Sequence, residues 1–149
     1  MKTRRRVKLY NVIFPVWMLI LFPATWLIVL PGNFIIDSIV LVLALRLLKS
    51  DTVLALYKKS ILKVFIFGLI SDFLGSLFML LMLFSGVSET AEELYLTIPA
   101  IIISALLIFI FDYFISFKDF EKPKRLKLSV IFALFTAPYT FLIPTSLIY

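Results

Sequence analysis

The chain has 149 residues, 62% of them hydrophobic, a net charge of +6, and neither cysteine nor histidine. A soluble domain of this length has only about 45–50% apolar residues, so the composition predicts an integral membrane protein. The missing residue types exclude disulfides, zinc or haem sites built on Cys or His, and a Ser-His-Asp triad. Because the basic residues flank apolar runs, we expect anionic lipid headgroups, and not nucleic acid, as their partner.

The first third of the chain predicts a helical hairpin. Residues 9–30 form an apolar run too long for the core of a signal peptide, so we expect a retained first transmembrane helix. Leu30-Pro31-Gly32-Asn33 is typical of a tight turn. The second span, 32–48, is short, and Arg46 at its end extends it by reaching the membrane surface.

Three further spans are predicted at residues 61–84, 98–117 and 128–147. Residues 49–63 separate apolar from basic side chains, which predicts a short amphipathic helix at the membrane surface before the third span. The third span carries Gly68, Asp72 and Gly75, small and polar residues of the kind at which membrane helices pack. The expected fold is a single all-α transmembrane domain, 1–149, with five helices.

The positions of the basic residues predict the orientation of this five-helix bundle. All fifteen Lys and Arg residues fall before the first span, at or between the facing ends of the second and third spans, or between the fourth and fifth spans. Cytoplasmic segments of membrane proteins are enriched in these residues. We therefore expect a cytoplasmic N-terminus, an outside C-terminus and insertion in a bacterial plasma membrane.

Asp72 is the main candidate site residue because a carboxyl group near the middle of a span is costly without a functional or structural role. Desolvation disfavours its charged form, so a proton or a bound cation is expected to neutralise it. A structural hydrogen bond that fixes helix packing is the alternative. The hydroxyl groups expected to hydrogen-bond Asp72 at this proton or ion site belong to Ser76, Ser104, Thr136, Tyr139 and Thr140.

Two other carboxylates fall within predicted spans. Asp112 and Arg46 are expected at a similar depth near the cytoplasmic side and are candidates for a buried ion pair, unless Asp112 is simply solvated. Asn33 and Asp37 share a helix face near the outer surface and form a candidate polar site or a packing contact.

No catalytic, nucleotide-binding or metal-binding motif is present in the sequence, and no enzyme activity, metal or cofactor is expected. The first function that we consider is a non-catalytic membrane subunit or assembly protein with a membrane-protein partner. The alternative is a small proton- or cation-coupled transporter or channel component that uses Asp72, functioning as a homo-oligomer. A membrane-embedded lipid-modifying enzyme or protease is the third possibility, and it lacks a recognisable motif.

Overall fold

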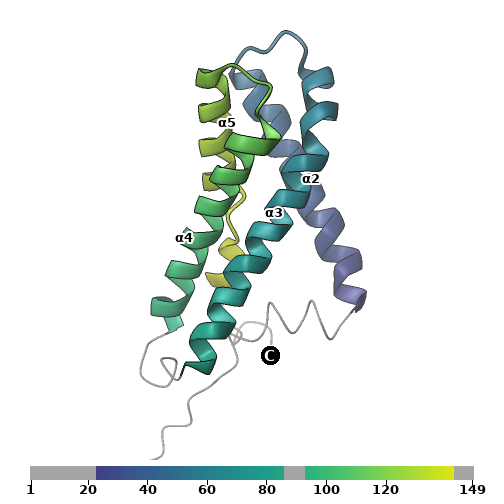
Figure 1. The fold of residues 1–149 in the computed structure, drawn as a ribbon. Coiled ribbons are helices and arrows are strands. Elements are labelled where there is room, and N and C mark those ends of the chain that lie inside the picture. Colours follow the sequence, from purple (N-terminus) through teal and green to yellow (C-terminus); the bar gives the residue numbers. More distant parts are fainter. Residues whose placement is uncertain (1–22, 86–92, 143–149) are drawn as a thin grey trace, which may run out of the picture.

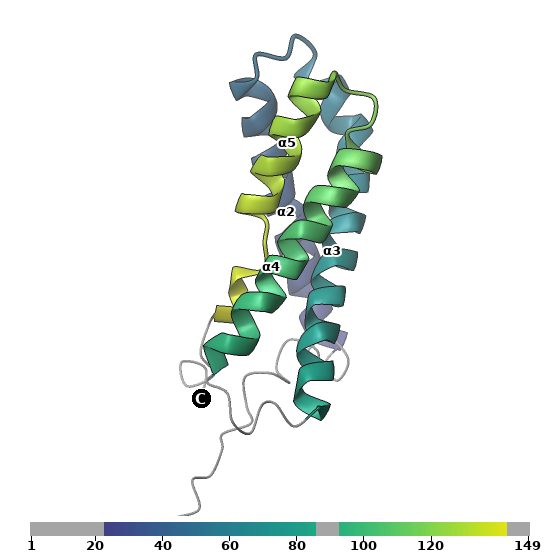
Figure 2. The ribbon, with the colours of Figure 1, turned by 60° about the vertical axis from the view of Figure 1, so that its left-hand side comes forward.

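The computed structural model describes residues 23–85 and 93–142, and over these ranges the chain forms helices and their connections without any strand (Figure 1). The helices run antiparallel to their neighbours in sequence, and α3 lies beside α4 in both ribbon views (Figure 2). Their bounds are α2 Pro23–Leu47, α3 Val53–Phe84, α4 Glu93–Phe111, a π-helix Asp112–Ser116, α5 Lys122–Phe135 and a 3-10 helix Tyr139–Leu142.

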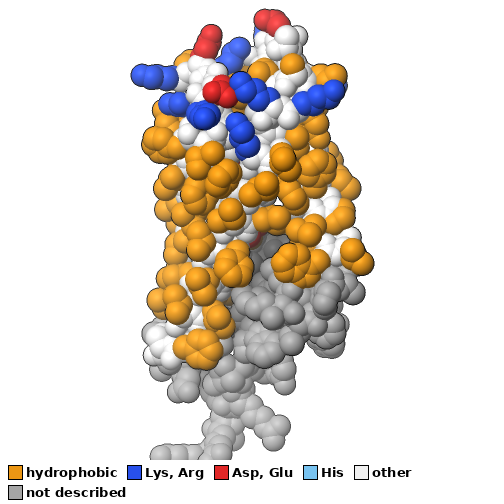
Figure 3. All heavy atoms as spheres, turned by 45° about the vertical axis from the view of Figure 1, so that its right-hand side comes forward, with side chains coloured by type: hydrophobic (Ala, Val, Ile, Leu, Met, Phe, Trp, Pro, Cys, Tyr) orange, Lys and Arg blue, Asp and Glu red, His pale blue; other side chains and the backbone are white. Residues whose placement is uncertain are grey.

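Three of the described helices are long and apolar enough to cross a membrane, by their length and composition. The spans are Trp26–Leu47, Val53–Met82 and Thr97–Ser116. Their outward side chains are apolar, and the Lys and Arg side chains gather at one end of the molecule (Figure 3). An apolar belt below a basic rim is what a bilayer with anionic headgroups accommodates, so the chain is a membrane protein.

The predicted hairpin in the first third of the chain is wrong. Residues 23–47 form the single helix α2, with Pro31 inside it, in place of two spans that meet at a turn. Proline removes one N–H donor, but a turn at this depth in lipid would leave several backbone groups without hydrogen bonds. Continuing the helix is the less costly choice. Residues 9–22 of the predicted first span lie outside the described residues.

The predicted surface helix before the third span is also wrong as a separate element. Val53 begins α3, which continues without interruption to Phe84. No glycine or proline lies between Val53 and Gly68, so the sequence has no residue that would bend the helix where a surface segment should join the span. Lys58 and Lys59 are exposed side chains on the first turns of the same helix.

The predicted fifth span, 128–147, differs most from the observed helix. Helix α5 begins earlier, at Lys122, with Pro123 in its first turn, and it ends at Phe135. Its 14 residues measure about 21 Å, too short to cross a hydrocarbon core of about 30 Å. Pro138 lies three residues after the end of the helix, where it cannot continue the hydrogen-bond pattern. The described residues therefore contain three candidate spans and not five.

Two short connections lie at the basic end of the molecule (Figure 1). After α2, Lys49 has a positive φ of 48°, and Ser50 N donates to Leu45 O at 3.1 Å, the pattern of a Schellman cap. Between the π-helix and α5, the Arg125 guanidinium lies 4.2 Å from the centre of the Tyr113 ring. Both connections therefore have defined conformations that hold the basic ends of the helices together.

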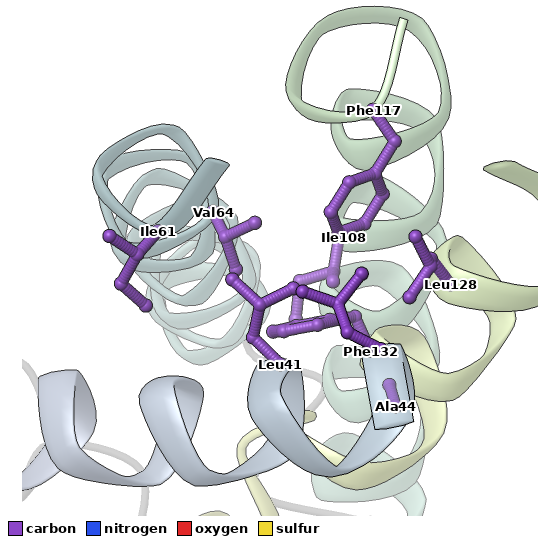
Figure 4. Close-up of a cluster of buried hydrophobic side chains, with 9 residues drawn as sticks. Leu41, Ala44, Ile61, Val64, Ile108, Phe117, Leu128 and Phe132 are labelled. Carbon is purple, nitrogen blue, oxygen red and sulfur yellow. The ribbon is translucent and has the colours of Figure 1, made fainter. Parts of the chain in front are cut away.

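The largest core cluster joins all four long helices in the half of the molecule near the basic end (Figure 4). Leu41 from α2 and Val64 from α3 point toward Phe132 of α5, and Phe117 closes the cluster from the segment after the π-helix. A smaller cluster in the other half contains Met79 and Ala100. The better-packed half therefore fixes the helix positions around the buried polar residues described next.

A candidate intramembrane carboxylate site

Asp37 lies in the middle of α2 and faces α3. Because α2 starts at Pro23, Asp37 is about 21 Å from the start of the helix and about 15 Å from its end at Leu47. Asp37 was predicted near the outer surface because a turn was expected at Leu30–Asn33. This prediction is wrong because α2 continues through those residues. Only 7% of Asp37 is exposed, and a Cβ atom on Gly68 would lie 3.8 Å from its Oδ2.

Two further carboxyl groups lie near enough to Asp37 for their charges to interact with its charge. Asp72 lies one helical turn beyond Gly68 on α3, and Asp112 opens the π-helix with only 1% of its surface exposed. Each of them lies within electrostatic range of Asp37. A recessed acidic side chain is visible between apolar ones below the basic rim (Figure 3). Three helical elements thus bring one carboxyl group each toward the bundle interior.

Asp72 and Asp112 each have a carboxyl oxygen without a hydrogen-bond partner among the described residues. Asp72 Oδ1 and Asp112 Oδ2 are buried and accept no hydrogen bond from the described residues. Ser116 is near enough to interact with the Asp112 carboxyl group, but its hydroxyl makes no regular hydrogen bond. Buried polar atoms are nearly always paired, so these oxygens indicate water, a proton or an ion at this place.

The predicted Asp112–Arg46 ion pair does not form. Arg46 is exposed in the last turn of α2, and the ion pair found within residues 23–85 and 93–142 is Lys59–Asp119, at 3.0 Å between Nζ and Oδ2. Lys59 donates a hydrogen bond to Asp119 and thereby lowers the pKa of that exposed carboxyl group. The cations of the described chain thus remain at the rim, because their hydration there outweighs pairing with a buried carboxylate.

The hydroxyl groups predicted to surround Asp72 donate to backbone carbonyls instead. Ser76 Oγ donates to the carbonyl of Asp72 at 2.9 Å, and Ser104 Oγ donates to the carbonyl of Ser71 at 3.1 Å. Thr136 and Tyr139 donate to carbonyls of α5. Thr140 lies in the 3-10 helix, and its side chain is outside the described part. The structure therefore brings together carboxyl groups where the sequence predicted one carboxyl group among hydroxyls.

Asn33 lies one turn before Asp37 on the same side of α2 and is partly buried. The predicted shared face is therefore found, although it lies deeper in the helix bundle than expected. Within the described residues, no group of three acidic side chains is arranged to hold a metal ion. Asp37, Asp72 and Asp112 are thus near enough to influence one another but do not form a metal centre.

The small residues of α3 divide between two neighbours. Gly68 faces Asp37 of α2, whereas Gly75 faces α4, where an added Cβ atom would overlap Ser104 Oγ and lie 3.1 Å from Ala100 O. Sequence reasoning treated them as one stripe, and it also missed the π-helix at Asp112. Gly68 and Gly75 are seven residues apart and therefore lie on the same side of α3, so the packing of α2 and α4 decides which neighbour each glycine meets. No signal in the sequence marks this division or the π-turn.

The chain matches no protein-family model, and comparison with curated proteins and with solved structures found no match.

Proposed function

We propose that this chain is a small multi-pass protein of a bacterial plasma membrane whose buried carboxyl groups bind and release a proton or a small cation during transport. The observation that carries the proposal is the convergence of Asp37, Asp72 and Asp112 from three helical elements without a Lys or Arg partner among the described residues. Ionisable side chains within membrane spans are costly and usually belong to ion or proton pathways.

The energetics favour alternation between two states at such a site. A buried carboxylate without a cation is costly, and neighbouring negative charges add to this cost. Neutralisation by a proton or a bound cation removes both contributions, and its release restores them. Because the carboxyl groups lie within electrostatic range of Asp37, uptake of a proton or cation at one group depends on the charge of its neighbour.

The orientation follows from the distribution of charge. The basic ends of α2, α3 and α5 and the connections between them lie at one end of the molecule (Figure 3), and that end is proposed to face the cytoplasm. In this orientation Asp112 is the one nearest the cytoplasm among the three carboxyl groups Asp37, Asp72 and Asp112. The predicted cytoplasmic N-terminus and outside C-terminus concern segments beyond the described residues and stay predictions.

A non-catalytic membrane subunit is the second candidate. Many large apolar side chains of the three spans are exposed, and Gly32 on α2 has open space where a Cβ atom would lie. A small residue on an exposed face allows another membrane helix to approach closely. The partner is then either a second copy of this chain or a different membrane protein.

The proposal is tested with purified protein in liposomes that contain a pH-sensitive dye, with an imposed proton or cation gradient. We expect flux from the unchanged chain and a loss of at least tenfold in Asp37→Asn, Asp72→Asn and Asp112→Asn, since an amide cannot ionise. The matched control is Asp51→Asn, the same substitution at an exposed residue between α2 and α3. If assembled wild-type protein gives no flux above empty liposomes, transport by this chain alone is refuted.

Mild extraction from native membranes separates the two candidates. A stoichiometric membrane partner, with inactive liposomes of the isolated chain, supports the subunit. A homo-oligomer with flux supports the transporter. Gly32→Leu, which fills the open space on α2, should weaken a partner contact there without reducing flux through the carboxyl groups.

A further inference from the structure

Among the buried polar atoms without hydrogen-bond partners in the described residues, three belong to α3 and the π-helix near the basic end. They are Ser60 Oγ on α3, Ser116 Oγ at the end of the π-helix, and Asp112 Oδ2 at its beginning. The exposed fractions of these residues are 0%, 3% and 1%, so bulk solvent does not reach them in this conformation. Each unpaired atom destabilises the fold if its surroundings are dry.

The antiparallel packing of α3 and α4 places Ser60 and Ser116 at the same level. Ser104 Oγ donates to Ser71 O at 3.1 Å, which fixes the register of the two helices. Ser60 precedes Ser71 by about three helical turns, and Ser116 follows Ser104 by about the same length. The aromatic contact Phe67–Phe111, with centroids 5.2 Å apart, lies between these two levels, and α3 packs against the π-helix.

Other buried serines show that Ser60 and Ser116 are exceptional. Ser71 Oγ and Ser129 Oγ each donate to the carbonyl four residues earlier, at 2.8 and 2.9 Å, and both residues are 0% exposed. Ser116 ends the π-helix, where Phe117 N donates to Asp112 O at 2.8 Å, and the Ser116 hydroxyl makes no such bond. π-turns inside helices frequently occur at functional sites.

We propose that Ser60, Ser116 and Asp112 line a small internal water site just below the cytoplasmic surface, and that this water gives protons access to the carboxyl groups. The inference rests on the proposed function and narrows its substrate to the proton. Hydroxyl groups beside a single carboxyl group suit water better than a metal ion, which needs several oxygen ligands. The exposed Lys59–Asp119 pair marks the surface beside this site.

Proton transfer through this site exchanges only O–H bonds. A water molecule held by the two serine hydroxyls gives a proton to the Asp112 carboxylate and regains one from cytoplasmic water. Asp112 then passes the proton toward Asp37, which lies within electrostatic range of both Asp112 and Asp72. The order along the membrane normal is Asp112, Asp37 and Asp72, counted from the basic end, because Phe67 contacts Phe111, Gly68 faces Asp37, and Asp72 lies one turn further along α3.

The absence of native cysteine allows a direct test by single-cysteine variants. Ser60→Cys and Ser116→Cys are treated in inside-out vesicles with 2-aminoethyl methanethiosulfonate, a small water-soluble thiol reagent. The matched controls are Ser71→Cys and Ser129→Cys, equally buried serines whose hydroxyls have partners. We expect the first two to react at least tenfold faster than the controls, because a site that exchanges water with the cytoplasm admits the reagent and stabilises the thiolate, whereas a dry interior does neither.

Reaction of Ser60→Cys and Ser116→Cys no faster than the controls would overturn the water site. If the cysteine variants fail to assemble, the thermal stability of Ser116→Ala is the second measurement. This variant should be as stable as the unchanged chain or less stable, because it loses a hydroxyl group that binds the water. A clear gain in stability contradicts the proposal, since deleting an unpaired hydroxyl from a dry site is favourable. Reactive cysteines without proton flux would refute the proposed transport alone, whereas flux with inert cysteines would refute only this water site.

Discussion

Helix α3 presents two contrasting faces to its neighbours. Toward α4 it presents Gly75 and the carbonyl of Ser71, and Ser104 fills the space and makes the hydrogen bond. Toward α2 it presents Gly68 and Asp72, opposite Asp37, and the space that Gly68 leaves is occupied by a carboxyl group. One face is satisfied by close packing, and the other retains unpaired charge-bearing groups.

Similar small residues serve different purposes on the two faces of α3. Packing against α4 needs only closeness of the backbones, which dispersion and a weak interhelical hydrogen bond stabilise. On the face toward α2, Asp37 and Asp72 lie within electrostatic range of each other, and two like charges at such a distance repel. Such a face is expected to change state with protonation, whereas the α4 face is expected to remain fixed.

Breaking the α4 face should have the largest effect. Gly75→Ala places a Cβ atom where Ser104 Oγ lies and 3.1 Å from Ala100 O, so we expect a loss of about 1–3 kcal/mol. Thermal unfolding in detergent measures it. The control is Gly32→Ala, in open space on α2, which should not destabilise the fold. Equal behaviour of the two variants would mean that α3 and α4 are not in close contact at Gly75.

The α2 face is examined by a double-substitution cycle on Asp37→Asn and Asp72→Asn. Because these carboxyl groups lie within electrostatic range, their effects on stability at neutral pH should be non-additive by at least about 0.5 kcal/mol. Asp37→Asn combined with Asp51→Asn serves as the control pair and should be additive, since Asp51 is exposed outside the spans. Additivity in both cycles would mean that Asp37 and Asp72 do not interact, and the contrast between the two faces of α3 would not hold.

Removing the hydrogen bond between α3 and α4 should have a smaller effect than filling Gly75. Ser104→Ala deletes the donor to Ser71 O, and interhelical hydrogen bonds in membranes average about 0.6 kcal/mol. The same thermal unfolding assay measures the loss. Ser104→Ala should also lessen the damage caused by Gly75→Ala, because it removes the overlapping oxygen. A double variant that is no more stable than Gly75→Ala alone would contradict that geometry.

The smallest effect is expected at the rim, where Lys59 and Asp119 are paired in solvent. Because Lys59 lowers the pKa of the Asp119 carboxyl group, the contribution of the pair is present at neutral pH. It is lost as the pH falls through that lowered pKa. Asp119→Asn should therefore remove a small acid-dependent part of the stability. An unfolding curve that keeps the same pH dependence in this variant would show that the pair contributes nothing.

Several features were predictable from sequence because they depend on local properties. The all-helical fold, the membrane class and the span at Thr97–Ser116 follow from long apolar runs. The basic rim follows from the positions of the Lys and Arg residues along the chain. The turn at Leu30–Asn33 failed because turn propensity in water was applied to a segment where lipid enforces continued helical hydrogen bonding.

By itself, the sequence determined that this chain forms apolar helices, that its charges lie at their ends, and that carboxyl groups are buried within them. Only the tertiary structure decided which polar groups meet. The continuation of α2 through Pro31 put Asp37 in the middle of a span, and packing against α3 placed it beside Gly68. In the π-helix, Asp112 and Ser116 were left with unpaired oxygens. The physical reason is that helix ends and register depend on packing between distant segments, which no local pattern encodes.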